Sequence, residues 1–158
     1  MKPVCLVLGA GAGIGGTVAT RFAQEGYHSC LCRRSDQKGL DKLVGNIKTE
    51  GGSASGYLLN AIEDNVIEDL ITSIESEIGP IEVLVYNLGA QTGMKLLQET
   101  THKEFEWGWR MANFGLFRAA KVVCPLMEER GKGTILVTSA TAAMRGNKTQ
   151  HSHASAMG

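Results

Sequence analysis

The start of the chain constrains its fold more than any other part of the sequence, because a short apolar run leads directly into a cluster of glycines. Residues 4–8 read VCLVL, and the next eight residues include Gly9, Gly11, Gly13, Gly15 and Gly16. A pattern typical of a helix follows over residues 17–24. A strand, a glycine turn and a helix N-terminus in this order form a cradle for a pyrophosphate, because backbone N–H groups and the positive end of the helix dipole face the anion. The sequence therefore predicts a nucleotide-binding α/β domain.

Two spacings of these glycines fit phosphate-binding turns. Gly11-x-Gly13-x-x-Gly16 matches the general dinucleotide fingerprint, whereas Gly9-x-x-x-Gly13-x-Gly15 matches a second arrangement. We favour the second spacing, because the apolar run stops directly before Gly9 and the turn should open there. A tight turn without any ligand is the alternative interpretation, because small residues also serve turns that bind nothing.

Apolar runs and helical patterns alternate along the rest of the chain. Strands are predicted at residues 4–8, 27–32, 53–59, 81–86 and 134–138, and helices at residues 17–24, 40–47, 66–78 and 101–130. This alternation predicts right-handed βαβ units, and hence a doubly wound, Rossmann-like α/β fold with about five parallel strands in the order 3-2-1-4-5 and helices on both faces. The residues after Thr138 carry little apolar periodicity and are expected to form loops. We expect one domain over residues 1–158 that is incomplete at its C-terminal end.

Composition and charge argue against several classes of partner. The chain has 158 residues, and its 16 Lys and Arg residues balance its 16 Asp and Glu residues. No basic stripe indicates a nucleic acid, and no basic amphipathic helix or long apolar segment indicates a membrane. The four cysteines, Cys5, Cys30, Cys32 and Cys124, include no C-x-x-C pair that would suggest a metal site. Reduced thiols in a cytoplasmic protein are the simplest interpretation.

Several short motifs, in order along the whole chain, resemble those of the short-chain dehydrogenase/reductase family. The matching residues are Gly9, Gly13, Ile14 and Gly15 of the glycine turn, the segment Asn87-Leu88-Gly89-Ala90, Asn113, and residues 133–139. The resemblance implies a nicotinamide dinucleotide at the glycine turn, with Asn87 and Gly89 as a wall beside it. It also implies that Asn113 is the asparagine of the family's catalytic tetrad and that the substrate is a carbonyl or alcohol compound. A tight turn at a strand end is the alternative interpretation for Asn87 and Gly89.

The residues that carry proton transfer in the family are replaced in this chain. The family's Tyr-x-x-x-Lys motif falls on His153 and Met157, and the usual spacing puts the catalytic serine at Ala140. Ser139 lies next to that position, so the catalytic candidates are Asn113, Ser139 and His153, with a solvated loop histidine as the alternative for His153. Because methionine has neither the charge nor the donor of lysine, we expect severely reduced or absent turnover. A non-catalytic cofactor-binding protein, or a fragment that pairs with another chain, stays open.

The identity of the cofactor is argued from the ends of the second and third strands. Arg33 and Arg34 end the second strand, and guanidinium groups suit the 2′-phosphate of NADP(H). An acidic residue at this place would favour NAD(H), and Asp36 keeps that alternative open. Asn60 follows the third strand, where the family usually has an aspartate near the adenine. We therefore predict NADP(H) bound at Arg33, Arg34 and Asn60, in preference to NAD(H).

The expected protein partner follows from the same resemblance. In the family, the helix that corresponds to residues 101–130 packs in a dimer interface. We therefore expect Phe114, Phe117, Val123 and Met127 to be partly uncovered and to support a homodimer. The sequence does not specify the chemical class of the carbonyl or alcohol substrate, although the loop over residues 91–100 is expected to border its pocket.

Overall fold

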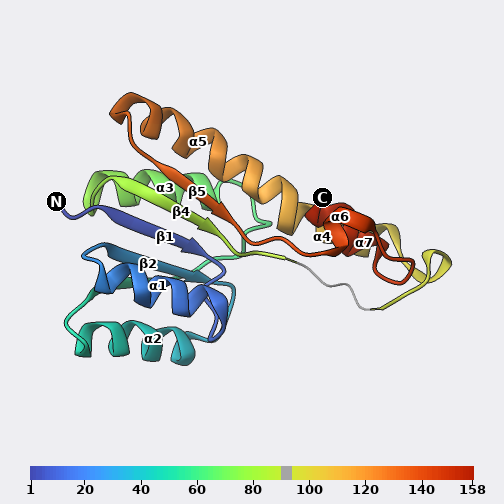
Figure 1. The fold of residues 1–158 in the computed structure, drawn as a ribbon, viewed down its shortest axis with the longest axis horizontal. Helices are drawn as coiled ribbons and strands as arrows, with labels where there is room; N and C mark the ends of the chain where they lie inside the picture. The colour runs from blue at the N-terminus through green and yellow to red at the C-terminus, as the bar shows by residue number, and fades with distance from the viewer. Residues whose placement is uncertain (90–93) are drawn as a thin grey trace.

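The computed structural model describes residues 1–89 and 94–158 and contains a five-stranded sheet. Its strands are β1 (Val4–Leu8), β2 (His28–Arg33), β3 (Ser53–Leu58), β4 (Ile81–Tyr86) and β5 (Thr134–Val137). They lie in the order β3-β2-β1-β4-β5 (Figure 1), and every neighbouring pair is parallel. This confirms the strand order that the alternation of strands and helices predicts.

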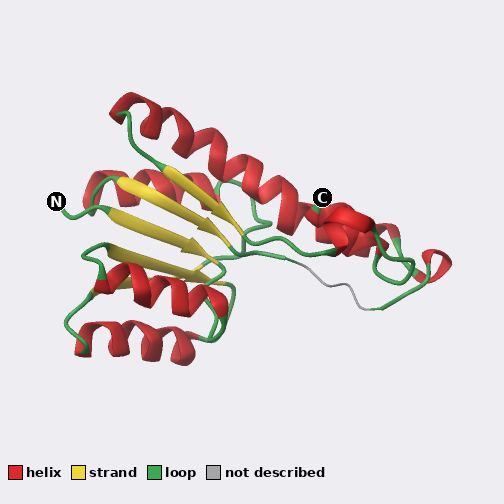
Figure 2. Cartoon of the chain, in the orientation of Figure 1, coloured by secondary structure: helices red, strands yellow, loops and turns green. Residues whose placement is uncertain are grey.

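Helices cover both faces of this sheet. Those that cover its faces are α1 (Ile14–Gln24), α2 (Gln37–Thr49), α3 (Val66–Glu77) and α5 (Gly115–Arg130). Helices α1 and α2 lie on one face, and α3 and α5 lie on the other (Figures 1 and 2). Each pair buries its own apolar core against the sheet, as a doubly wound fold requires. Among the residues described, no helix combines the length and the apolar character needed to cross a bilayer.

The central strand β1 divides its side chains between the two cores. All five of its residues are buried. Cys5 and Val7 pack in the core beneath α1 and α2, whereas Leu6 and Leu8 pack with residues of α3 and α5. Successive side chains of a strand point to opposite faces. A strand covered on both faces is therefore a continuous apolar run, which is the pattern at the start of the sequence.

The helix predicted over residues 101–130 is interrupted by a wider turn. It consists of α4 (His102–Trp109), the π-helical turn η2 (Arg110–Phe114) and α5. The Tyr86 hydroxyl, at the end of β4, donates a hydrogen bond to the Met111 carbonyl inside η2. A Cβ atom on Gly115 would overlap that hydroxyl, so the glycine leaves room for it. Because π-helical turns are often found at functional sites, η2 is a candidate part of the functional site.

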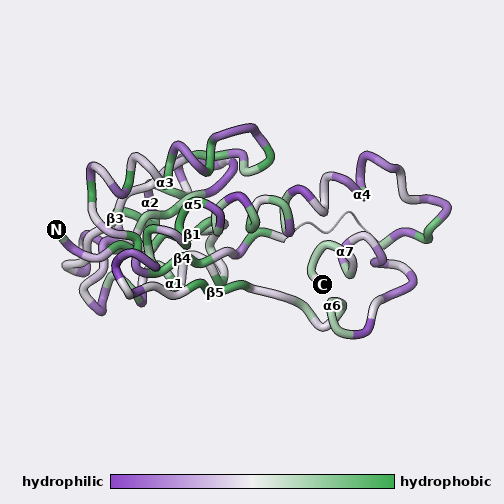
Figure 3. Tube along the Cα trace, turned by 90° about the horizontal axis from the view of Figure 1, so that it is seen from above, coloured by the Kyte–Doolittle hydropathy of each residue, from purple (hydrophilic) through white to green (hydrophobic). Residues whose placement is uncertain are grey.

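The expectation of loops after Thr138 is wrong, because this segment contains two short helices, α6 (Ala142–Arg145) and α7 (His151–Met157). Helix α7 packs against α4, and Figure 3 shows α4, α6 and α7 gathered beyond one end of the sheet. The buried residues of α7 are Ser152 and Ala156, four residues apart on one face. Because both are small and one is polar, they give no apolar periodicity in the sequence.

The outer side of α5 is less uncovered than expected. Phe117 is 58% exposed and Phe114 is half-buried, but Val123 and Met127 are buried. The expectation of uncovered side chains is therefore wrong for Val123 and Met127, because both pack in the core that α3 and α5 form with the sheet. The exposed aromatic side chain of α5 is that of Phe117, near its N-terminus.

Candidate functional site

The glycine turn between β1 and α1 is packed so closely that side chains do not fit in it. Gly9 has a φ of +96°, in the left-handed region that favours glycine. A Cβ atom on Gly9 would overlap the carbonyl oxygen of Asn87, and one on Gly15 would overlap the carbonyl oxygen of Gly9. A Cβ atom on Gly16 would likewise overlap the Gly11 carbonyl oxygen. Each of the two glycine spacings therefore contains a residue that packing alone requires to be glycine.

The N-terminus of α1 is open beside this turn. Helix α1 begins after Gly13, and no side chain of the described residues caps it. Among those residues, no heavy atom lies within 4 Å of the places that Cβ atoms on Gly11 and Gly13 would take, and Ile14 is 61% exposed. The first N–H groups of a helix have no partner within the helix. This end of α1 therefore offers donors and a positive dipole end to an anion.

A pocket lies between this turn and the ends of β2 and β3. It is lined by Gly9, Arg33, Arg34, Leu59 and Ala61, with Leu8, Cys32, Leu88 and Met111. The Arg33 guanidinium lies 3.5 Å from one oxygen of the Asp36 carboxylate. The other oxygen accepts a hydrogen bond of 3.0 Å from the Gly39 amide in the first turn of α2. Asp36 is thus engaged by its own helix and by Arg33, and both arginines border the pocket.

Asn60 lies next to the same pocket with an unused hydrogen-bond acceptor. Its neighbours Leu59 and Ala61 line the pocket, and its Nδ2 atom donates a hydrogen bond of 3.2 Å to the Glu63 carboxylate. Its Oδ1 atom is buried and has no hydrogen-bond partner within the described part of the chain. Buried polar atoms are normally satisfied, so Asn60 has one acceptor that the described chain does not use, next to the pocket but not on its lining.

The segment after β4 adjoins the glycine turn. The Asn87 amide donates to the Leu8 carbonyl at 2.8 Å, and the Asn87 Nδ2 atom donates to the Gly9 carbonyl at 3.0 Å. Asn87 therefore joins the turn to the end of β4. Gly89 lies two residues further, and the sulfur of Met157 lies 3.5 Å from the place that a Cβ atom on Gly89 would take.

A second pocket, with a volume of about 180 Å³, is bordered by η2, β5 and α7. It is lined by Asn113, Ser139 and Met157, with Leu88, Ala112, Leu116, Val137, Thr138, Ala156 and Gly158. Leu88 lines both pockets, so the two adjoin. The Ser139 hydroxyl donates a hydrogen bond of 3.2 Å to the Met157 carbonyl. The structure thus brings together two of the three predicted catalytic residues, Asn113 and Ser139.

The third predicted catalytic residue, His153, is not among the described residues that line this pocket. It lies on α7 and is half-buried, and its Nδ1 atom is buried without a hydrogen-bond partner in the described chain. The alternative of a solvated loop histidine is therefore wrong. Within residues 1–89 and 94–158, no group of three or more His, Cys, Asp or Glu side chains is placed to hold a metal ion.

Sequence reasoning does not find two residues that shape the site. Tyr86 holds the Met111 carbonyl, two residues before Asn113. Arg118 on α5 is only 8% exposed, and its guanidinium donates to the Ala61 carbonyl at the first pocket. In the sequence, Tyr86 is visible only as a phenol at the end of an apolar strand, and Arg118 only as a cation among the apolar residues of a helix. Neither pattern predicts the hydrogen-bond partner of the side chain.

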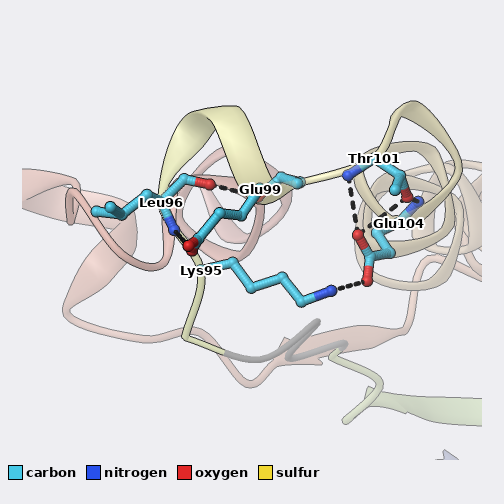
Figure 4. A network of polar contacts seen from close by, with 6 residues as sticks. Lys95, Leu96, Glu99, Thr101 and Glu104 are labelled. Carbon is cyan, nitrogen blue, oxygen red and sulfur yellow. Dashed lines mark hydrogen bonds and ion pairs between the residues drawn. The ribbon is translucent and has the colours of Figure 1, made fainter.

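The segment before α4, which includes the short 3₁₀ helix η1 (Leu97–Glu99), is held by a network of polar contacts (Figure 4). Lys95 forms an ion pair with Glu104. The Glu104 carboxylate also accepts hydrogen bonds of 2.9 Å from the backbone amide and the hydroxyl of Thr101. The Lys95 amide donates to the Thr149 carbonyl at 2.9 Å, which ties this segment to the loop before α7. Residues 90–93, which include part of the predicted substrate border, lie outside the described residues.

Comparisons with known sequences point to a single family. The family model described as short chain dehydrogenase matches residues 3–156. A 3-oxoacyl-[acyl-carrier-protein] reductase FabG of Thermotoga maritima is 30% identical over 96% of this chain and 61% of that protein. A 2,3-dihydro-2,3-dihydroxybenzoate dehydrogenase of Bacillus subtilis is 29% identical over 89% of this chain and 53% of that protein. The chain thus spans 53–61% of the lengths of these two relatives.

Solved structures are similar over nearly the whole chain. A 7α-hydroxysteroid dehydrogenase complexed with NADH and 7-oxo glycochenodeoxycholic acid has a TM-score of 0.90 at 27% identity, over 98% of this chain and 60% of that chain. An NAD⁺-bound xylitol dehydrogenase has a TM-score of 0.90 at 25% identity, over 98% of this chain and 59% of that chain. The family match, the shared topology and the glycine turn agree, and the protein belongs to the short-chain dehydrogenase family, whose members bind nicotinamide dinucleotides.

Proposed function

We propose that this protein binds NADP(H) at the carboxyl end of its sheet and is an oxidoreductase of carbonyl or alcohol compounds with weakened catalysis. The observation that carries the proposal is the uncapped N-terminus of α1, behind a turn in which Gly9 and Gly15 have no room for side chains. Such a turn lets the backbone approach a pyrophosphate closely while the helix dipole favours its charge.

Each part of the site is assigned to a part of the cofactor. The pyrophosphate binds at the glycine turn, at Gly9, Gly13, Ile14 and Gly15, and the 2′-phosphate binds at Arg33 and Arg34. The adenine binds near Asn60, and Asn87 and Gly89 form the wall beside the cofactor. The place of Asn60 supports the adenine assignment, because it lies between Leu59 and Ala61, which both line the first pocket.

Preference for NADP(H) over NAD(H) rests on the charges at the end of β2. Arg33 and Arg34 both line the first pocket. The carboxylate of Asp36, which would otherwise favour a ribose hydroxyl, caps α2 and lies beside Arg33. The two guanidinium groups outnumber the single carboxylate, which is already hydrogen-bonded to α2, so the local charge favours a phosphate. The related structures described above hold NADH or NAD⁺, so this preference is proposed for the present chain alone.

Weak turnover is proposed from the groups around the second pocket. Bound NADPH would supply a hydride to a substrate carbonyl. Asn113 and Ser139 line the pocket, but the Ser139 hydroxyl is directed to the Met157 carbonyl. Met157 has no proton to give and no charge with which to lower a neighbouring pKa. His153 is the remaining proton donor of the predicted set, and it would have to turn toward the pocket to act.

A non-catalytic NADP(H)-binding protein, which could pair with another chain, is the second candidate. It is favoured by Met157, whose sulfur lies beside Gly89 at the wall assigned to the cofactor. The thioether of Met157 can still contact the dinucleotide. It lacks the positive charge of the lysine that the family has at the end of its Tyr-x-x-x-Lys motif. Steady oxidation of NADPH by a simple ketone, lost on His153→Ala, would favour the catalytic candidate.

A homodimer through the helices of residues 101–130 is proposed as well. Trp109, Phe114 and Phe117 stack in a row, with ring centroids 5.3 Å and 6.3 Å apart. Trp109 is 40% exposed and Phe117 is 58% exposed. The row runs from α4 across η2 to α5, and exposed aromatic residues that gather in this way are typical of interface anchors. The free cysteines of this chain suit a reducing compartment, and we propose a cytoplasmic location.

Titration with NADPH and with NADH, followed by fluorescence, tests the cofactor assignment. The wild-type protein is expected to bind NADPH at least about tenfold more tightly than NADH, since charge-assisted hydrogen bonds to the phosphate are worth about 1.5–3 kcal/mol. The double variant Arg33→Ala/Arg34→Ala should lose that preference. Arg21→Ala is the matched control, because Arg21 is exposed and pairs with Glu25 on α1. Equal affinities of the wild-type protein for the two cofactors would refute the assignment.

A further inference from the structure

Arg118 joins α5 to α3 and to the segment that leads into α3, which lie about 50 or more residues earlier in the chain. It lies on α5 and is 8% exposed. Its Nε and Nη2 atoms donate to the two oxygens of the Glu68 carboxylate on α3, at 2.8 Å and 2.7 Å. Its Nη1 atom donates to the Ala61 carbonyl at 3.0 Å, and Nη2 donates to the Glu63 carbonyl at 2.9 Å. Arg118 thus fixes two consecutive turns of backbone between β3 and α3 from the side of α5.

The backbone that Arg118 holds is one wall of the first pocket. Leu59 and Ala61 line that pocket together with Arg33 and Arg34. Asn60 lies between them, and its Nδ2 atom donates to the carboxylate of Glu63, the residue whose carbonyl Arg118 also holds. The position of the unpartnered Oδ1 atom of Asn60 therefore depends on a segment that Arg118 fixes.

We propose that Arg118 is a positioning residue for the adenosine half of the cofactor. This inference rests on the proposed function, because it takes the adenosine 2′-phosphate to bind over the first pocket, which is itself small at about 20 Å³. Arg118 does not line the pocket; it acts through the carbonyls of Ala61 and Glu63. The Glu68 partner, whose pKa is lowered chiefly by its hydrogen bond with Arg118, keeps the guanidinium oriented. A lysine has no planar fork with which to serve both oxygens of Glu68 and two carbonyls at once.

The test compares Arg118→Lys with Arg130→Lys in the full chain. Arg130 is a matched control, since it lies on the same helix, donates to both oxygens of Glu75 on α3, and donates to a backbone carbonyl, that of Ile81, at 2.9 Å. It lies at the far end of α5, and neither Arg130 nor its partners line the first pocket. The probe is adenosine 2′,5′-bisphosphate, measured by calorimetry.

Arg118→Lys is expected to weaken binding of the bisphosphate about tenfold, as for the loss of one or two hydrogen bonds, and to speed amide hydrogen exchange over residues 59–65. Arg130→Lys should leave both unchanged. Unchanged affinity in Arg118→Lys, or an equal loss in both variants, would overturn the inference. If Arg118→Lys does not fold, Glu68→Gln against Glu75→Gln gives the same comparison. A wild-type protein that does not bind the bisphosphate would refute the proposed cofactor site itself, and this inference with it.

Discussion

At the scale of single residues, the glycine turn contains two kinds of glycine. A Cβ atom on Gly15 would overlap the Gly9 carbonyl oxygen, whereas one on Gly13 would meet no heavy atom of the described residues within 4 Å. Gly15 is therefore required by the packing of the protein on itself. Gly13 borders open space, at the end of α1 where we place the pyrophosphate.

Substitutions at Gly15 and Gly13 are expected to affect mainly the stability of the fold and mainly NADPH binding, respectively. Gly15→Ala is expected to destabilise the fold by about 1–3 kcal/mol, because overpacking forces the backbone apart. Gly13→Ala should cost less, about 0.5–1 kcal/mol, because Gly13 is the N-cap of α1 and alanine caps a helix less well than glycine. It should nevertheless weaken NADPH binding on the order of tenfold, because the methyl group would stand in the path of a phosphate. Urea denaturation and NADPH titration measure the two effects. Tight NADPH binding by Gly13→Ala would count against the pyrophosphate assignment.

The proton-transfer residues give a second prediction at this scale. The family resemblance predicts that Ala140, His153 and Met157 stand where the family has its serine, tyrosine and lysine. The triple variant Ala140→Ser/His153→Tyr/Met157→Lys should oxidise NADPH with a simple ketone about a hundredfold faster than the wild-type protein, the scale of one positioned acid–base group. The single variant Ala140→Ser is the control and should change little. A wild-type protein already as fast as the triple variant would show that its own residues suffice.

At the scale of elements, β2 and β3 are joined by a side-chain bridge as well as by their backbone ladder. The Nδ1 atom of His28 lies 2.6 Å from the Ser53 hydroxyl, and its Nε2 atom lies 2.9 Å from the Ser55 hydroxyl. Burial, and then the nearby charges of Lys2 and Lys48, lower the pKa of His28 below its usual 6.5. The neutral ring is therefore the form that the folded protein favours.

This bridge predicts an acid-sensitive term in stability. Above pH 6.5, His28 is neutral in the folded and the unfolded chain and does not change the free energy of unfolding. As the pH drops from 6.5 toward the lower pKa of the folded state, the unfolded chain takes up the proton first, so the folded protein loses stability. His28→Gln should remove this part of the pH dependence, as measured by urea denaturation at a series of pH values. His102→Gln, at an exposed position on α4, is the control. An unaltered pH dependence in His28→Gln would show that other groups cause it.

How well each element could be predicted depends on where its residues pack. The helices α1, α2, α3 and α5 bury apolar faces against the sheet, the inner strands β1, β2 and β4 are buried between them, and these patterns are visible in the sequence. Helix α7 buries Ser152 and Ala156, which no apolar pattern reveals. The π-helical turn η2 depends on a hydroxyl of β4 and on room at Gly115, and neither condition is local. The glycine turn could be predicted because its residues are consecutive in the sequence. The hydrogen bonds of Arg118 could not, because their acceptors lie at residues 61–68.

At the scale of the whole molecule, exposed aromatic residues and charge balance favour self-association. Phe117 is 58% exposed on α5, and the chain has equal numbers of basic and acidic residues, which gives little electrostatic repulsion between copies. The first and second pockets, in contrast, lie at the carboxyl end of the sheet and do not include Phe117. Phe117 lines a separate, wider cleft over α3 and α5, together with Phe114 and Arg118. A substitution at Phe117 is therefore expected to leave the two pockets assigned to cofactor and substrate unchanged.

Phe117→Glu is expected to shift the protein from dimer to monomer, because a charge at a buried interface position leaves an unpaired ion. Light scattering over a range of concentrations measures the shift. Met144→Glu is the control, because Met144 is an apolar residue 89% exposed on α6. A wild-type protein that is monomeric at high concentration would contradict the expectation, as would a dimer that persists in Phe117→Glu.

The π-helical turn η2 also sets the rotational phase between α4 and α5. A π-helical turn accommodates one residue more than an α-helical turn, and one residue corresponds to about 100° of rotation. Deleting one residue from Arg110–Phe114 would therefore allow a continuous α-helix that keeps α4 and α5 close to their present phase, whereas inserting one more residue would turn α4 by about 100° relative to α5. After such an insertion, the face of α4 that now packs on α7 would point elsewhere. A single-residue insertion should therefore be tolerated worse in η2 than in the exposed loop at Gly146–Lys148.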